Sequence, residues 1–165
     1  MRSPHLLKAG SNARRVRDNL VGVIDRNALA QIDRELESNV VSLFNLANEH
    51  YEFAKGPAAS SWRQRSSRLY YAAYAAVRAV KLEVDGHYST DVKDHAKVAD
   101  LPRALNNRER YKNSLGSLRD DRNLADYDHT AEVDELILDP RDAQDLVDSL
   151  LHDVRSLLTE RGVKL

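Results

Sequence analysis

The sequence predicts an all-α protein, folded as an up-and-down helical bundle of four to five main helices. Apolar side chains recur at steps of three and four residues over several long segments, which is the spacing of one helix face. Glycine and proline are scarce, with 6 and 4 copies among 165 residues. Alanine, leucine and arginine, which favour helices, are abundant. Together these features indicate helices joined by short connections.

Composition limits the classes of function that the chain could have. It contains no cysteine, which excludes disulfides, thiolate metal sites and a cysteine nucleophile. No apolar run is long enough to span a membrane and the first residues lack the apolar core of a signal peptide, so we expect a cytoplasmic protein without membrane contact. A net charge of −1 argues against a non-specific DNA binder. The first half of the chain is basic and the second acidic, which would suit docked protomers, an RNA on one face, or simply solvated helix faces.

Residues 1–26 are expected to form an N-terminal extension with one short helix capped by Ser11, and residues 27–165 the bundle. The apolar face of the short helix is expected to consist of Val16, Leu20, Val23 and Ile24. A long helix should begin near Asn27 and stop at Gly56-Pro57, because glycine followed by proline ends a helix. Its expected buried stripe is Leu29, Ile32, Leu36, Val40, Leu43, Ala47, His50 and Ala54.

The central helix is expected over residues 62–84, where apolar residues and alanines recur at helical spacing. Asp85-Gly86 ends it. Its three tyrosines are Tyr70, Tyr71 and Tyr74, and we expect them to pack in the core rather than to stack on nucleobases. Residues 86–92 are expected to form a loop. A short helix is expected over residues 93–106, interrupted by Pro102.

Two further helices are expected in the second half of the chain. The first covers residues 108–126 and is followed by an acidic, irregular segment over residues 128–138. The last helix has Asp139 as its cap and Pro140 at its first position, and Gly162 ends it. Its buried stripe is expected to be Ala143, Leu146, Val147, Leu150, Val154, Leu157 and Leu158.

The segment 119–129, RDDRNLADYDH, carries the residues best suited to chemistry on phosphodiesters. The guanidinium of Arg122 could hold phosphate oxygens in bidentate fashion, and the imidazole of His129 could accept or deliver a proton near neutrality. Asn123 could orient either group. We expect Arg122 and His129 to be largely exposed in a cleft. A structural role is the alternative, because Asp126 lies four residues after Arg122 and can pair with it along the helix.

Residues 43–158 resemble the HEPN domains, in particular the small stand-alone prokaryotic branch with an Ala-Asp-Tyr motif. Three elements carry the resemblance: the segment 68–79 (RLYYAAYAAVRA), Asp94-His95 with Val98, and the segment 119–128 with Ala125-Asp126-Tyr127. The resemblance implies a helical bundle that forms a homodimer around its motif helices. For active members it implies a metal-independent endoribonuclease, acting as a toxin or defence effector and paired with a nucleotidyltransferase-type antitoxin.

Carried onto this sequence, the active-member motif of an arginine, a polar residue and a later histidine falls on Arg122, Asn123 and His129 as catalytic residues. Arg119, Asp126 and Tyr127 are the expected substrate-binding residues, and tRNA or mRNA the expected substrate. The reaction would be attack of an RNA 2′-hydroxyl on the adjacent phosphate, without a metal or any other cofactor. Six residues separate Arg122 from His129, the long limit of the motif.

A non-catalytic HEPN module, which binds a nucleotide or a partner nucleotidyltransferase, is the competing interpretation. A histidine seven positions after an arginine lies on nearly the same helix face but about 10 Å further along the axis. The two side chains would converge only if the helix unwinds after Asp126, or if a second protomer completes the site. His50 and His152 are expected to serve packing, and His87 with His95 lacks the carboxylates of a metal pair.

Overall fold

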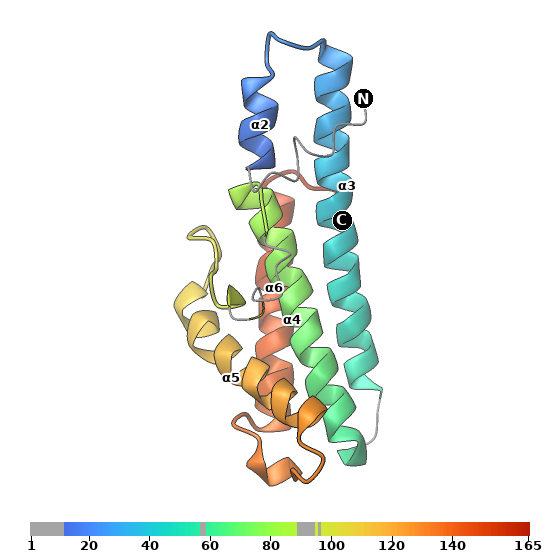
Figure 1. Cartoon of the computed structure of the whole chain (residues 1–165), viewed down its shortest axis with the longest axis vertical. Coiled ribbons are helices and arrows are strands. Elements are labelled where there is room, and N and C mark those ends of the chain that lie inside the picture. Colours follow the sequence, from blue (N-terminus) through green and yellow to red (C-terminus); the bar gives the residue numbers. More distant parts are fainter. Residues whose placement is uncertain (1–11, 57–58, 89–94, 96) are drawn as a thin grey trace.

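The protein is an all-helical bundle, as the sequence predicts, in a computed structural model that describes residues 12–56, 59–88, 95 and 97–165. No β-sheet occurs in these ranges. Its elements, in chain order, are α2 (Ala13–Asn19), α3 (Arg26–Lys55), the 3-10 turn η1 (Ala59–Ser61), α4 (Trp62–Asp85), α5 (Arg108–Tyr127), the 3-10 turn η3 (Val133–Glu135) and α6 (Pro140–Glu160). In Figure 1, α3, α4 and α6 run along the long axis, and α5 crosses them obliquely.

Helix α4 is the centre of the bundle, which confirms the prediction for residues 62–84. It packs against α3, α5 and α6. Small side chains allow these helices to approach closely, and the four alanines Ala72, Ala73, Ala76 and Ala79 are completely buried. Gly86 ends α4 in the left-handed conformation, at φ 71°. The space around Gly86 is also filled, because a Cβ there would meet the side chain of Asn12. Glycine therefore serves both the turn and the contact with α2.

Helix α3 is slightly longer than expected, and its buried face differs from the predicted one at two large positions. Asp25 caps the helix by accepting hydrogen bonds from the backbone N–H groups of Asn27 and Ala28, at 2.8 and 3.0 Å. Phe44 and Tyr51 are buried, whereas the expected stripe members Leu43 and His50 are only half-buried. Most of the predicted stripe is therefore confirmed, and the two differences remove two large aromatic side chains from water. The buried residues of α3 are Leu29, Leu36, Val40, Phe44, Ala47, Tyr51 and Ala54.

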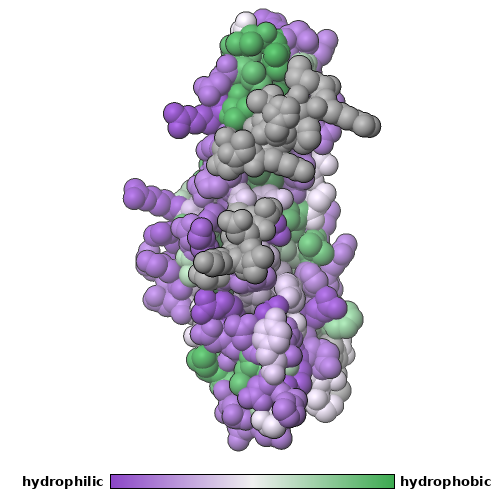
Figure 2. Space-filling view, in the orientation of Figure 1, coloured by the Kyte–Doolittle hydropathy of each residue, from purple (hydrophilic) through white to green (hydrophobic). Residues whose placement is uncertain are grey.

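The N-terminal helix α2 is shorter than its apolar pattern predicts. Asn12 caps it by accepting a hydrogen bond from the N–H of Arg15, at 2.9 Å, whereas the expected cap Ser11 lies outside the described residues. The helix ends at Asn19, and a turn with Gly22 at φ 81° follows. Val23, expected on the buried face, is consequently 73% exposed and Val21 57%. In Figure 2 a hydrophobic patch accordingly covers this end of the molecule.

The short helix expected over residues 93–106 is not present over residues 97–106, which form turns, while 93, 94 and 96 lie outside the described residues. Pro102 interrupts the pattern, and Asn107 adopts a left-handed φ of 53° directly before α5. Val98, Leu101 and Leu105 nevertheless reach the core, so the apolar spacing reflects anchoring of turns rather than a helix face.

The two C-terminal helices agree with the sequence. Helix α5 extends one residue past the expected end, to Tyr127. Asp139 caps α6 by accepting from the N–H of Arg141, at 2.8 Å, with Pro140 at the first helical position. The seven stripe residues expected on α6 are all buried. Between these helices, η3 is a single 3-10 turn within an otherwise irregular acidic segment, as expected.

Candidate functional site

The candidate site lies where α5 crosses α4, and Arg122 is at its centre. Only 9% of Arg122 is exposed, so the expectation of a largely exposed side chain is wrong. One guanidinium nitrogen, Nη2, donates to the hydroxyl of Tyr71, and Nη1 donates to Oδ1 of Asn123 at 2.9 Å and to the hydroxyl of Tyr127 at 3.4 Å. Nε lies 2.9 Å from Oδ2 of Asp126, an ion pair without the alignment of a directed hydrogen bond. All three nitrogens therefore have partners within the chain.

Aromatic rings surround the same guanidinium. Its central carbon lies 5.6 Å from the ring centre of Tyr70, 5.2 Å from that of Tyr71 and 5.4 Å from that of Tyr127, which are cation–π distances. Burial lowers the pKa of Arg122, but the hydrogen bond with Tyr71 and the negative charge of Asp126 outweigh burial and raise it. The guanidinium therefore stays charged, and three tyrosines and one carboxylate stabilise it.

An imidazole reaches the same tyrosines, but it belongs to His95 and not to His129. Nδ1 of His95 lies 2.7 Å from the hydroxyl of Tyr70. The His95 ring also stacks on Tyr74, with ring centres 4.6 Å apart and planes inclined by 22°. Burial raises the pKa of Tyr70, so this phenol keeps its proton near neutrality. Tyr70 thus contacts an imidazole on one side and a guanidinium on the other. We call Tyr70, Tyr71, Tyr74, His95 and Arg122 the tyrosine cluster.

A second arginine fixes the backbone beyond the end of α5. Arg63, on α4, donates to the carbonyl oxygens of Ala125, Asp128 and Ala131, at 3.0, 2.5 and 2.6 Å. The carboxylate of Asp128 accepts from the N–H and the hydroxyl of Thr130, and these hydrogen bonds lower the pKa of Asp128. The turn that carries His129 is therefore stabilised both by Arg63 and by the hydrogen bonds of Asp128 with Thr130.

The predicted site residues separate into two groups. Arg122 contacts Asn123, Asp126 and Tyr127 beside the tyrosine cluster. His129 is exposed, and no hydrogen bond or ion pair within the described part of the chain joins it to Arg122. Arg119 pairs with its neighbour Asp120 instead, at 2.8 Å. Within one protomer the arginine and histidine of the motif are not brought together.

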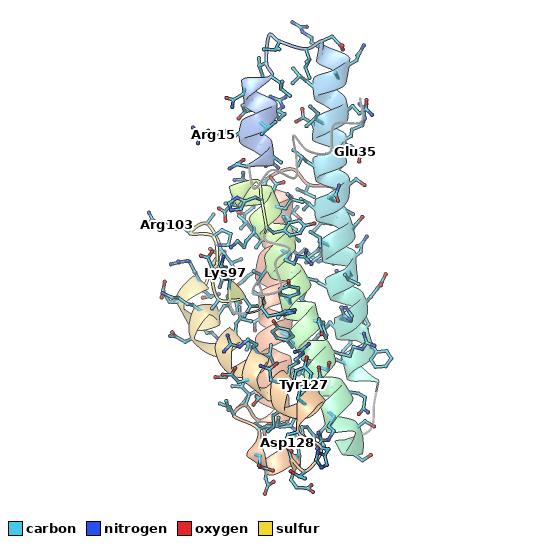
Figure 3. All side chains as sticks on the ribbon, in the orientation of Figure 1. Arg15, Glu35, Lys97, Arg103, Tyr127 and Asp128 are labelled. Carbon is cyan, nitrogen blue, oxygen red and sulfur yellow. The ribbon has the colours of Figure 1, made fainter. Side chains whose placement is uncertain are left out.

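The surface beyond Arg122 is both acidic and apolar. Tyr127 is 74% exposed, Val133 43% and Ile137 62%. Exposed carboxylates alternate with them: Asp126, Asp128, Glu132, Asp134 and Glu135. Figure 3 shows Tyr127 and Asp128 together near the end of the molecule opposite α2. We call residues 126–137 the acidic end surface.

Several contributors to the site are not recognisable from the sequence. Arg63 and the pairing of Tyr71 with Arg122 join positions 51 or more residues apart, and no local pattern marks such contacts. His95 was noticeable only through its place in the family resemblance. The apolar residues Val98, Leu101 and Leu105, at steps of three and four, give no further sign of the histidine beside them.

Neither a metal site nor a membrane span is apparent in the described ranges. No group of three or more histidine, aspartate or glutamate side chains there is arranged to hold a metal ion. None of the helices combines the length and apolar character that crossing a bilayer requires. Comparison of the chain with family models, with curated proteins and with solved structures finds no match.

Proposed function

We propose that this chain is a non-catalytic helical module of HEPN type, and that it binds a partner protein through its acidic end surface. The proposal rests on one observation, which is that the guanidinium of Arg122 is already fully engaged within the chain. Its three guanidinium nitrogens already bind Tyr71, Asn123, Tyr127 and Asp126, so a phosphate would have to displace partners from the same chain. The cluster supports the architecture at the crossing of α4 and α5 better than it supports phosphate binding.

Charge favours a protein over an RNA at this surface. His129 lies in a segment with five exposed carboxylates. An RNA phosphate that approaches His129 would meet like charges. Arg63 and Arg122, which bind residues of this segment, are already occupied by carbonyl groups and side chains. Nucleic-acid affinity depends mainly on cations that neutralise phosphates. Residues 126–137, which form the acidic end surface, contain no lysine or arginine that could do so.

The partner should present basic side chains around an apolar patch. Complementary charge would steer the encounter, and the exposed tyrosine, valine and isoleucine would supply apolar contact area. The resemblance to HEPN domains suggests a small nucleotidyltransferase as the first candidate. A nucleotidyltransferase gene beside the gene for this chain would identify the protein to test.

The decisive measurement is direct binding of that nucleotidyltransferase, by titration calorimetry. Val133→Lys with Ile137→Lys should weaken binding by about tenfold or more, because two like charges would face the basic partner and the apolar contact would be lost. Val21→Lys with Val23→Lys is the matched control, since these valines are similarly exposed at the opposite end of the molecule. Equal effects of the two double variants would contradict the assigned surface.

A metal-independent endoribonuclease is the second candidate, and the tyrosine cluster favours it. Tyr70 brings the imidazole of His95 and the guanidinium of Arg122 to one place. In this reaction an imidazole takes the proton of an RNA 2′-hydroxyl, the oxygen attacks the adjacent phosphorus, and the 5′-oxygen leaves with a proton. The products are a 2′,3′-cyclic phosphate and a 5′-hydroxyl, and Arg122 would stabilise the phosphorane oxygens.

Incubation of the purified protein with tRNA and mRNA in EDTA separates the two candidates. Intact RNA supports the binding module. Cleavage that His95→Ala reduces by about 10²–10⁴-fold, as expected for loss of a general acid or base, would support the nuclease at the tyrosine cluster. Cleavage that requires His129 instead would restore the motif expected from the sequence and place the histidine in a site shared between protomers. His152→Ala, an exposed histidine on α6, is the control.

A further inference from the structure

A partly enclosed pocket of about 200 Å³ lies between α4, α5 and α6, beneath the segment that leads into α6. It is separate from the tyrosine cluster, because the neighbouring side chains Asp121 and Arg122 leave α5 toward different partners. Most of its lining is apolar, and the principal contributors are Trp62, Leu69, Leu118, Leu136, Leu138 and Ala143.

One wall of the pocket carries a cation with unused hydrogen-bonding capacity. Arg65, on α4, donates from Nη2 to Oε1 of Gln144 on α6, at 2.8 Å. Its Nε is shielded from solvent and is therefore closed to a ligand. Nη1 is not shielded in this way and makes no hydrogen bond with the described residues, so it can donate to a group that enters the pocket. Ser66 lines the same region and adds a hydroxyl.

The wall formed by α5 carries an anion whose two oxygens are both in use. Oδ1 of Asp121 accepts from the N–H of Ile137 at 2.7 Å, and Oδ2 accepts from the N–H of Leu138 at 3.0 Å. These bonds tie the segment before α6 to α5 and so form the roof of the pocket. An anionic ligand would be repelled from this side, which directs its charged group toward Arg65.

We propose that the pocket binds a small carboxylic acid with an aromatic or branched apolar body. The body would occupy the apolar interior between Trp62 and Leu118, and the carboxylate would accept hydrogen bonds from Arg65. Arginine is well suited to this role, because its planar guanidinium matches the geometry of a carboxylate. The volume suits one ring and a short acid group, since apolar cavities of about 150 Å³ in proteins accept benzene.

The single tryptophan of the chain gives a direct readout, because Trp62 lines the pocket. Phenylacetate should change the tryptophan fluorescence in a saturable manner, and calorimetry should give the same dissociation constant. Phenylacetamide, which has the same shape without the charge, should bind about tenfold more weakly or worse, as expected for loss of a charge-assisted hydrogen bond.

Three variants test the assignment of the two ends of the ligand. Arg65→Gln should weaken phenylacetate binding about tenfold and change phenylacetamide binding less than about twofold. Arg141→Gln, an exposed arginine on α6 outside the pocket lining, should change neither. Ala143→Leu should abolish binding of both compounds by filling the interior, and its thermal midpoint will verify that it folds.

The outcomes are distinct. Saturable binding of phenylacetate that is lost in Ala143→Leu and weakened in Arg65→Gln supports the site. Absence of binding at millimolar phenylacetate would overturn it, and so would equal affinity for the acid and the amide. Because the free protein is used, these results do not depend on the partner protein or the RNA of the proposed function.

Discussion

The hydroxyl of Tyr70 and Nδ1 of His95 lie 2.7 Å apart, and they join the central helix to a residue 25 positions further along the chain. Burial raises the pKa of Tyr70, so the phenol keeps its proton and can donate it in this hydrogen bond. When Nδ1 accepts, the ring proton of neutral His95 must be on Nε2. This hydrogen bond thereby helps to hold the imidazole of His95 against the central helix.

We expect Tyr70 and His95 to be energetically coupled. A double-mutant cycle with Tyr70→Phe and His95→Gln should give a coupling free energy of about 1 kcal/mol, the usual value for one hydrogen bond. Urea denaturation of the parent, both single variants and the double variant measures it. The same cycle with His152→Gln, which alters an exposed histidine, should give a coupling near zero. Additive effects of Tyr70→Phe and His95→Gln would show that the contact contributes no net stability.

Arg122→Ala should destabilise the fold strongly. Removal of the buried guanidinium deletes its hydrogen bonds and ring contacts and leaves the hydroxyl of Tyr71 without its partner, and such losses typically cost about 2–3 kcal/mol. Arg119→Ala is the comparison, because Arg119 is a more exposed arginine on the same helix, and it should change the free energy of unfolding by less than about 0.5 kcal/mol. If both variants are as stable as the parent, Arg122 is available for a ligand and its structural role is refuted.

Asp121→Asn should destabilise the protein, and more so as the pH falls. An asparagine offers one acceptor oxygen where the carboxylate serves two backbone N–H groups, which should cost about 1–2 kcal/mol near neutral pH. Burial raises the pKa of Asp121 above 3.8, so the folded state binds this proton more tightly than the unfolded state does. The stability that the parent gains from protonation of Asp121 is therefore absent well above the raised pKa and complete below pH 3.8.

The test is urea denaturation of the parent and Asp121→Asn at several pH values between neutrality and pH 4. The difference in free energy of unfolding should widen toward low pH. A difference that narrows on acidification would mean that the carboxylate is stabilised in its charged form despite its burial.

We expect the chain to form a homodimer with α5 at or beside the two-fold axis. The resemblance to HEPN domains and the opposite charges of the two halves of the chain motivate this prediction. Multi-angle light scattering at micromolar concentration measures the mass directly. A stable monomer would contradict the prediction and would also remove any site completed by a second protomer.

The helices could be predicted because their signals are local. Asp139-Pro140 and the stripe that follows establish α6 from positions within a few turns of one another. The same is true of the alanine-rich α4. The pattern over residues 97–106 misleads, because Val98, Leu101 and Leu105 are spaced like a helix face but anchor turns. Apolar periodicity shows that residues face the core, and it does not by itself distinguish a helix from a chain of turns.

The candidate site could be predicted only in part. Contacts along α5 follow from helix geometry, so the pairing of Arg122 with Asp126 was foreseeable as an alternative. The burial of Arg122 was not, because it depends on Tyr70 and Tyr71 from another helix. The position of His95 beside these tyrosines likewise depends on tertiary packing. Residue type and spacing identified the arginine, whereas packing brings His95 and Arg122 to the same tyrosine, Tyr70.

The three carbonyl groups that Arg63 binds have a consequence for how the acidic end surface would recognise another molecule. Because the end of α5 and the following turn are fastened to α4, this backbone should open as a cooperative unit instead of fraying residue by residue. A surface already ordered before an encounter loses little conformational entropy on association. Even a modest contact area there could therefore give useful affinity.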